Sequence, residues 1–445
     1  MAMERDQATK FIHDLLRLMI SRKGSDLFIT ADFPPAIKVD GKVNKVSPQA
    51  LTHGHTIALV RSVMNDKQAA EFEKTKECNF AISPAGIGRF RCNAFMQSGK
   101  VGMVFRLIPQ ELPTIDELFM DGKLIRKIAG QVGLENGEEQ DTKKLFEQII
   151  EKRELELRLR REGKLTDKET LHLDLSQLEM NNLRLVETLK NVAMTERGLA
   201  IMVGGTGTGK STTLAAMVDW RNTHSYGHII TVEDPVEFVH PHKNCIITQR
   251  EVGLDTDSWE AALKNTLRQA PNVILMGEIR DRETMEHAVA FAETGHLCLA
   301  TLHANSANQA LDRIINFFPE ERRQQLLMDL SMNLRALISQ RLIRRESGKG
   351  RTAVVEIMLG TPLVSDLIFK GEVGEIKDLM RRSRELGMQT FDQALFDAFE
   401  KGLISYEDTL RYADSSNDVR LQIKLNSQRA KNRDLTAGTE GLEIM

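Results

Sequence analysis

The chain has 445 residues, 41% of them apolar and 28% charged, and at about 150 residues per domain its length predicts two or three domains. The 60 basic and 63 acidic residues give a net charge of −3, which offers no support for broad electrostatic binding to nucleic acid. The 4 cysteines form no CxxC pair, so neither a disulfide framework nor a zinc ribbon is indicated, and reduced thiols in a cytosolic protein fit best.

The amino-terminal segment MAMERDQATKFIHDLL is too polar and acidic for a signal peptide. No window approaches 18 uninterrupted apolar residues, so we expect no transmembrane helix. We therefore expect a cytoplasmic protein that can contact a membrane only through a partner.

Residues 1–110 predict an α+β domain. The spacing of Ile12, Leu15, Leu16 and Met19 puts an apolar stripe on one face of a helix over residues 8–22. Short strands follow, separated by turn residues. They are SDLFIT, AIKVDGKV with a turn at Asp40–Gly41, CNFAIS, GRFRCNAFMQ and VGMVFRLIP.

Residues 111–182 read as a linker that contains a charged helical insertion. Pro109 and Pro113 mark its start, and its centre, EEQDTKKLFEQIIEKRELELRLRREGKLTDKE, is dense in charges of both signs and in helix formers. Leu145, Phe146, Ile149 and Ile150 share one face of this helix. Two interpretations stay open: a solvated insertion, or a docking helix for a partner.

Residues 183–360 alternate apolar strands with helical patterns, which predicts a βαβ-type sheet buried on both faces. The predicted strands are GLAIMVGG, GHIITVEDP, NVILMGEIR, GHLCLATLH and TAVVEIML. We expect helices over residues 309–342, a helical carboxy-terminal region over 361–425, and a disordered tail over 426–445.

The stretch GGTGTGKS fits the phosphate-loop pattern G-x-x-x-x-G-K-[ST], with a strand before it and a helix after it. Glycines let successive N–H groups point inward as an anion cradle. Lys210 would reach the β- and γ-phosphates of ATP, and Ser211 would bind Mg²⁺. The predicted nucleotide-binding residues are Gly204, Gly205, Thr206, Gly207, Thr208, Gly209, Lys210, Ser211 and Thr212.

Acidic residues follow two of the predicted strands. Glu278 comes after NVILM, at the position where an α/β sheet places its ligands, with Gly277 where an aspartate is usual. We expect Glu278 to hold Mg²⁺ through water, to position the attacking water, or both. Glu233 in ITVEDPVEF is a candidate second acid near the γ-phosphate, with a solvated carboxylate as the alternative.

Two histidines flank the strand LCLATL. We expect His303 to lie at the same sheet edge as the phosphate loop and to detect the γ-phosphate, and His296 is a further candidate. An ordinary core or surface role is the alternative, and metal binding is disfavoured because no third ligand stands at a useful spacing.

Together GGTGTGKS, ITVEDPVEF, ILMGEIRD and TGHLCLATLHANSAN resemble the secretion-ATPase superfamily, with its Walker A, Asp, Walker B and His boxes in order. SDLFITADFPPAIKVDGKV and IGRFRCNAF resemble its PilT/PilU family of type IV pilus retraction (twitching motility) ATPases, and TQREVGLDT looks closest to the PilU members. The resemblance implies a PAS-like amino-terminal domain and a RecA-like ATPase domain in a homohexamer that uses ATP and Mg²⁺. The charged insertion is longer than the linker that this family pattern has.

The resemblance also implies partners and site residues. Arg91 and Arg106 would complete a neighbour's nucleotide site, because an arginine is a permanently charged fork for phosphate oxygens. Arg89 could replace Arg91, and surface arginines are the alternative. The implied partners are an inner-membrane pilus platform protein and a sibling retraction ATPase. A motor, an accessory ring and, more weakly, a nucleic-acid translocase stay open as functions.

Overall fold

The computed structural model describes residues 4–39, 42–109, 111–120, 122–131, 134, 148 and 175–430. These residues form two compact units. The first comprises Met1–Leu112 with Val236–His240 and Gly253–Asp257, and the second takes the rest of the chain from Pro113 onward. Almost all of the charged centre of the expected insertion, the turn at Asp40–Gly41 and residues 431–445 of the expected tail lie outside the described residues.

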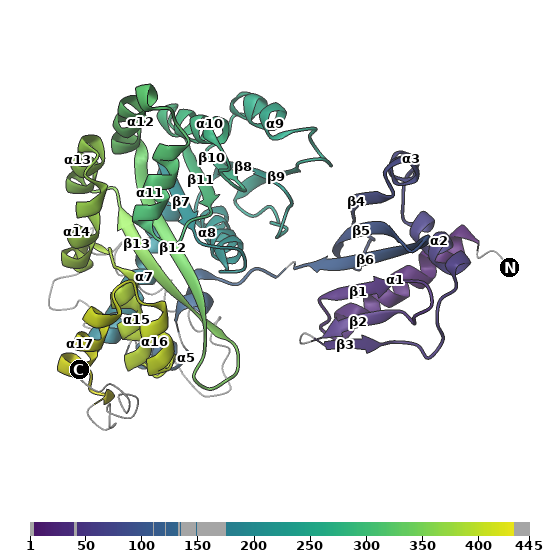
Figure 1. Ribbon diagram of the computed structural model, residues 1–445, viewed down its shortest axis with the longest axis horizontal. Coiled ribbons are helices and arrows are strands. Elements are labelled where there is room, and N and C mark those ends of the chain that lie inside the picture. The colour runs from purple at the N-terminus through teal and green to yellow at the C-terminus, as the bar shows by residue number, and fades with distance from the viewer. Residues whose placement is uncertain are drawn as a thin grey trace, which may run out of the picture. The chain divides into compact units, whose positions relative to one another are not determined.

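The first unit is an α+β domain built on a six-stranded antiparallel sheet (Figure 1). Its elements are α1 (Arg5–Ser21), β1 (Asp26–Ile29), β2 (Ala36–Val39), β3 (Lys42–Lys45), α2 (His53–Ser62), α3 (Asp66–Thr75), β4 (Glu77–Ile82), β5 (Arg89–Gln97) and β6 (Lys100–Ile108). The strand order is β3-β2-β1-β6-β5-β4. The predicted apolar stripe of α1 packs on Phe90 and Phe105 of the sheet, which confirms the expected class of this domain.

The second unit contains a seven-stranded sheet in the order β13-β12-β7-β11-β10-β8-β9 (Figure 1). Its strands are β7 (Gly198–Val203), β8 (Gly227–Glu233), β9 (Cys245–Glu251), β10 (Val273–Met276), β11 (Leu297–Leu302), β12 (Leu334–Arg344) and β13 (Arg351–Leu359). All neighbouring pairs are parallel except β12 with β13. This is the doubly covered α/β sheet that the sequence predicts.

Helices pack on both faces of this sheet. The helices are α4 (Ile115–Phe119), α5 (Gly122–Gln131), α7 (Gln177–Ala193), α8 (Lys210–His224), α9 (Trp259–Thr266), α10 (Arg282–Glu293), α11 (Ala307–Asn316), α12 (Glu320–Asn333), α13 (Pro362–Lys370), α14 (Ile376–Arg382), α15 (Phe391–Glu400), α16 (Tyr406–Tyr412) and α17 (Ser416–Asn426). Leu199 and Ile201 of β7 face the core formed with α9–α13, whereas Ala200 and Met202 face the core formed with α4, α5, α7 and α8. Every residue of β7 is buried, as its unbroken apolar run predicts.

One predicted element is wrong. We expected helices over residues 309–342, but the chain leaves α12 at Asn333 and continues as β12, between β7 and β13. Leucine, arginine and glutamine favour helix locally, and the burial of β12 between two strands overrides that preference. The sequence analysis also did not identify β9.

The described flanks of the expected linker belong to the second unit. Ile115, Ile125 and Leu189 from α4, α5 and α7 share one core with the sheet. Lys190 and Asp116 form an ion pair at 2.8 Å, with both side chains largely buried. Along the chain, the boundary between the two units lies at Leu112–Pro113, close to the start of the expected linker.

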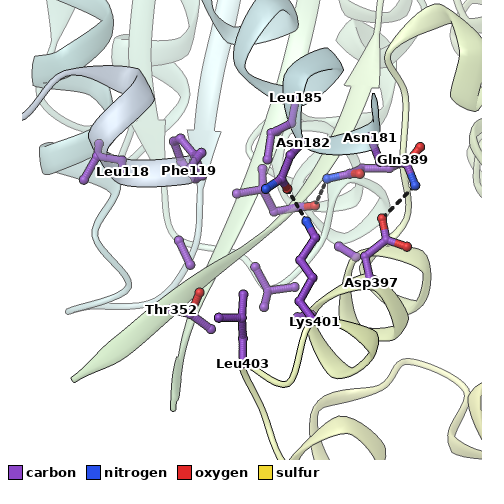
Figure 2. Close-up of a pocket in the computed structure, with 15 residues that line it drawn as sticks. Leu118, Phe119, Asn181, Asn182, Leu185, Thr352, Gln389, Asp397, Lys401 and Leu403 are labelled. Atoms are coloured by element: carbon purple, nitrogen blue, oxygen red, sulfur yellow. Dashed lines mark hydrogen bonds between the residues drawn. The ribbon is translucent and has the colours of Figure 1, made fainter. Parts of the chain in front are cut away.

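The carboxy-terminal helices pack on α7 through polar contacts (Figure 2). The Asn181 amide donates to the Asp397 carboxylate of α15 at 3.0 Å, and Lys401 bonds to Asn182. These side chains line a pocket of about 60 Å³, which has room for a few water molecules. Order extends past α17, because Ser427 and Ala430 are buried, which differs from the expected tail at 426–445.

Two absences hold for the described part of the chain. None of its helices combines the length and the apolar character that a bilayer crossing requires. It also contains no cluster of three or more His, Cys, Asp or Glu side chains placed to hold a metal ion, and all 4 cysteines are buried and unpaired.

Candidate functional site

The phosphate loop joins β7 to α8 at the carboxyl edge of the sheet. Gly204 and Gly209 have φ of 156° and 87°, which other residues rarely adopt. A Cβ at Gly209 would lie 2.7 Å from Nε2 of Gln340, and one at Gly204 would lie 2.5 Å from the Thr208 hydroxyl. The loop keeps this shape only with glycines, and the shape fits a phosphate at the amino end of α8. Thr206 and Gly207 at its tip are exposed, as is Ser211 in the first turn of α8.

Lys210 lies folded into its own loop. Its ammonium donates to the carbonyls of Gly204 and Gly205 at 2.7 and 2.8 Å. Burial lowers the pKa of Lys210, and the negative charge of Glu278 opposes that effect. Lys210 is thus a partly desolvated cation that is held by two backbone carbonyls. Its ammonium can exchange these two carbonyls for phosphate oxygens.

Glu278 follows β10 at the same edge of the sheet. Its carboxylate accepts a hydrogen bond from Nε of Arg280 at 3.0 Å and lies 3.2 Å from Nε2 of His303. Arg280 also reaches Asp234 at 3.2 Å, so one guanidinium links the acids of two neighbouring loops. Glu278 is only one-quarter exposed.

The close packing around Gly277 accounts for a glycine at the position where an aspartate is usual. A Cβ at Gly277 would lie 3.2 Å from the Cα of Glu233 and 3.3 Å from the Trp259 ring. The Gly277 amide donates to the Val232 carbonyl at 2.8 Å, so the loops after β8 and β10 are in close backbone contact. Glu233 lies in this contact, but its carboxylate accepts from the Thr231 hydroxyl at 2.7 Å.

The structure separates the two candidate histidines. His303 follows β11, whose Leu302 pairs with Val203 of β7, and the Gly204 amide donates to the Leu302 carbonyl at 3.2 Å. His303 is therefore adjacent to the phosphate loop and to Glu278. His296 precedes β11 at the opposite edge of the sheet, where its Nδ1 contacts the Thr294 hydroxyl at 3.0 Å. His296 does not belong to this cluster.

The candidate arginines lie side by side in the first unit. Arg91 of β5 and Arg106 of β6 are directly opposite one another in the antiparallel ladder. Asp26 of β1 is opposite Arg106 on the other side and accepts from its Nε at 2.8 Å. This buried carboxylate offsets the repulsion that two paired cations would otherwise suffer. Arg89 lies on β5 opposite Ile108.

Sequence reasoning missed Gln340 and Arg341 on β12. The side-chain carboxamide of Gln340 donates through Nε2 to the Thr208 carbonyl at 2.8 Å and accepts through Oε1 from the Thr213 hydroxyl at 2.8 Å. Arg341 donates to the Asn305 carbonyl at 3.0 Å, two residues after His303. The only available signal was a polar pair inside an apolar run, and it is visible only once residues 334–344 are read as a strand.

The fold and this cluster define a P-loop ATPase with a RecA-like core. Residues 160–411 match the family model described as Type II/IV secretion system protein. The chain is 51% identical over 97% of its length to the type IV pilus ATPase PilU of Pseudomonas aeruginosa, covering 95% of that protein. It is 37% identical over 89% of its length to the pilus retraction ATPase PilT of the same organism, covering 96% of it.

A solved structure is similar to this chain in both fold and sequence. The pilus retraction motor PilT with bound ADP superposes with a TM-score of 0.72 at 31% identity, covering 92% of this chain and 99% of that one. The chain belongs to the Type II/IV secretion system protein family. It is an ATPase, and it binds nucleotide.

Proposed function

We propose that this chain assembles as a hexameric ring that uses ATP hydrolysis to drive type IV pilus retraction. One observation carries the proposal: Lys210, Glu278 and His303 converge at one sheet edge in a chain that is 51% identical to a type IV pilus ATPase. The ring would act at the cytoplasmic side of the inner membrane by binding a platform protein at the base of the pilus.

Each residue of the cluster has a part in this reaction. Lys210 releases the two loop carbonyls and neutralises the β- and γ-phosphates, and the loop N–H groups hold the same oxygens. The Ser211 hydroxyl and, through water, Glu278 would hold Mg²⁺, which when bound neutralises phosphate charge. Glu278 orients the attacking water, Glu233 is a second acid, and His303 detects the γ-phosphate.

The arginines act on a neighbouring subunit. Arg106 has an exposed side chain, and Asp26 holds its Nε edge, so the fork is fixed in direction before it meets a phosphate. Arg91 stands beside it in the ladder. Mixing Arg106→Ala chains with Lys210→Ala chains tests this role. We expect each variant to be inactive alone and the mixture to regain turnover. A mixture as inactive as its parts would contradict catalysis between subunits.

Retraction itself is tested in cells that lack the native gene. Lys210→Ala should abolish ATP turnover and leave twitching as defective as the full deletion, whereas Lys264→Ala, an exposed lysine of α9, should behave as wild type. ATP turnover at the wild-type rate by the Lys210 variant would overturn the site assignment.

The same experiment distinguishes the motor from a second candidate function, an accessory ring that binds a sibling retraction ATPase. The higher identity to PilU than to PilT favours this alternative, because the name of the latter alone states retraction. If Lys210→Ala restores twitching to the deletion strain, the accessory function holds.

A further inference from the structure

Two adjacent residues of β12 hold two different loops of the nucleotide site. Successive side chains of a strand point to opposite faces of the sheet, so Gln340 and Arg341 leave β12 in opposite directions. Gln340 meets the phosphate loop, and Arg341 meets the loop that carries His303. Neither residue is close in sequence to the loop that it holds.

Gln340 is buried and makes both of its bonds to the phosphate-loop region. Its Nε2 donates to the Thr208 carbonyl at 2.8 Å, and its Oε1 accepts from the Thr213 hydroxyl at 2.8 Å. One carboxamide therefore fixes the loop relative to the first turn of α8. The closeness of Nε2 to Gly209 also limits how far the loop can move toward β12.

Arg341 joins the His303 loop to the carboxy-terminal helical region. Its guanidinium donates to the Asn305 carbonyl at 3.0 Å and to the Tyr412 carbonyl at 2.5 Å, and it pairs with Asp414 at 3.1 Å. The guanidinium carbon of Arg341, Cζ, lies 3.9 Å from the centre of the Phe391 ring. Four contacts thus fix the fork of a side chain that is about one-fifth exposed.

Asp414 is itself held in place. Lys377 pairs with its second oxygen at 2.6 Å, and the buried carboxylate of Asp392 accepts from the Asp414 and Ser415 amides at 2.8 and 3.2 Å. The far end of the His303 loop is fixed as well, because the Ala307 amide donates to Glu356 at 2.7 Å. The loop is therefore anchored on β12, β13 and the carboxy-terminal helical region.

We propose that Arg341 and Asp414 are a positioning pair for the hydrolytic step, and that Gln340 is a separate positioning residue for nucleotide binding. The Arg341–Asp414 pair sets where His303 stands beside Glu278, so the carboxy-terminal helical region supports hydrolysis directly. The inference rests on the proposed role of His303 at the γ-phosphate.

The test compares steady-state ATP turnover and nucleotide affinity of the full-length chain. Arg341→Lys keeps the charge and loses the fork, so kcat should fall about tenfold, the scale of one lost hydrogen bond to a charged group, while KM stays within about twofold. Asp414→Asn should lower kcat in the same direction by less. Gln340→Ala should instead raise KM about tenfold with a smaller change in kcat. Arg344→Lys, an exposed arginine on the same strand, is the matched control.

If Arg341→Lys and Gln340→Ala change kcat and KM in the same way, the two side chains of β12 do not have separate roles, and that result would overturn the proposal. If Arg341→Lys fails to fold, Asp414→Asn still decides, because a wild-type kcat in that variant contradicts the positioning pair. His303→Ala separates the two proposals: full activity there overturns the role of His303, whereas loss there with normal Arg341 and Asp414 variants overturns this inference alone.

Discussion

The buried carboxyl of Glu356 makes the stability of the second unit, here called the ATPase unit, depend on pH near neutrality. Glu356 lies on β13 opposite Ser339 and is 2% exposed. Burial raises its pKa to about 7, although the hydrogen bond from the Ala307 amide opposes the rise. In the unfolded chain the pKa returns to its ordinary value of 4.5. Between these two values the folded chain binds more protons than the unfolded chain, so the free energy of unfolding falls as pH rises from about 5 to about 8.

The size of this effect follows from the two pKa values. At about 1.4 kcal/mol per pH unit, a pKa moved from 4.5 to about 7 corresponds to about 3 kcal/mol lost above pH 7. Glu356→Gln stays neutral, and its amide oxygen can still accept from Ala307. The variant should therefore be more stable than wild type by only about 1 kcal/mol at pH 5 and by about 3 kcal/mol at pH 8.

Thermal unfolding at pH 5, 6, 7 and 8 measures this difference. For a unit of this size 1 kcal/mol moves Tm by about 2 °C, so the gap between variant and wild type should grow by about 5 °C across the series. Glu372→Gln, at an exposed position, is the control and should follow wild type at every pH. Parallel curves for Glu356→Gln and wild type would refute the reasoning.

Three further outcomes are expected. Glu278→Ala should bind ATP at near wild-type affinity and fail to hydrolyse it, and rapid phosphate release would contradict its role. Gly277→Ala forces apart the loops after β8 and β10, so turnover should fall at least tenfold while Tm changes by only a few degrees; unchanged turnover would show that the spacing is not needed. Lys190→Met leaves Asp116 buried without its cation and should cost about 3 kcal/mol, and adding Asp116→Asn should recover part of that in the same denaturation assay.

The sequence was sufficient to predict the parts of the site that depend on strand order. Carboxyl ends of parallel strands meet at one edge, so a loop after each of three apolar runs placed Lys210, Glu278 and His303 together. His296 does not join them, because it precedes β11 and therefore lies at the amino end of that strand, at the opposite edge of the sheet.

The parts that could not be predicted depend on contacts between distant residues. Gln340 meets Thr208 from 132 positions away, and Arg341 meets Tyr412 from 71. No local pattern records either contact, and the helix propensity of the surrounding residues hides the strand that makes them possible. The raised pKa of Glu356 has the same origin, since a carboxylate in VVEIML reads as surface until β13 is placed beside β12.

The ion pair between Lys127 and Glu179, at 2.7 Å, closes a ring of chain 52 positions long. The ion pair thus holds α5 beside the start of α7, and the entropic cost of closing such a ring grows only slowly with its length. A change in the number of residues between α5 and α7 therefore adds little to the entropic cost of holding these two helices together. We expect an affinity epitope inserted between residues 135 and 174 to change the free energy of unfolding only slightly, because it lengthens a ring that the ion pair already closes.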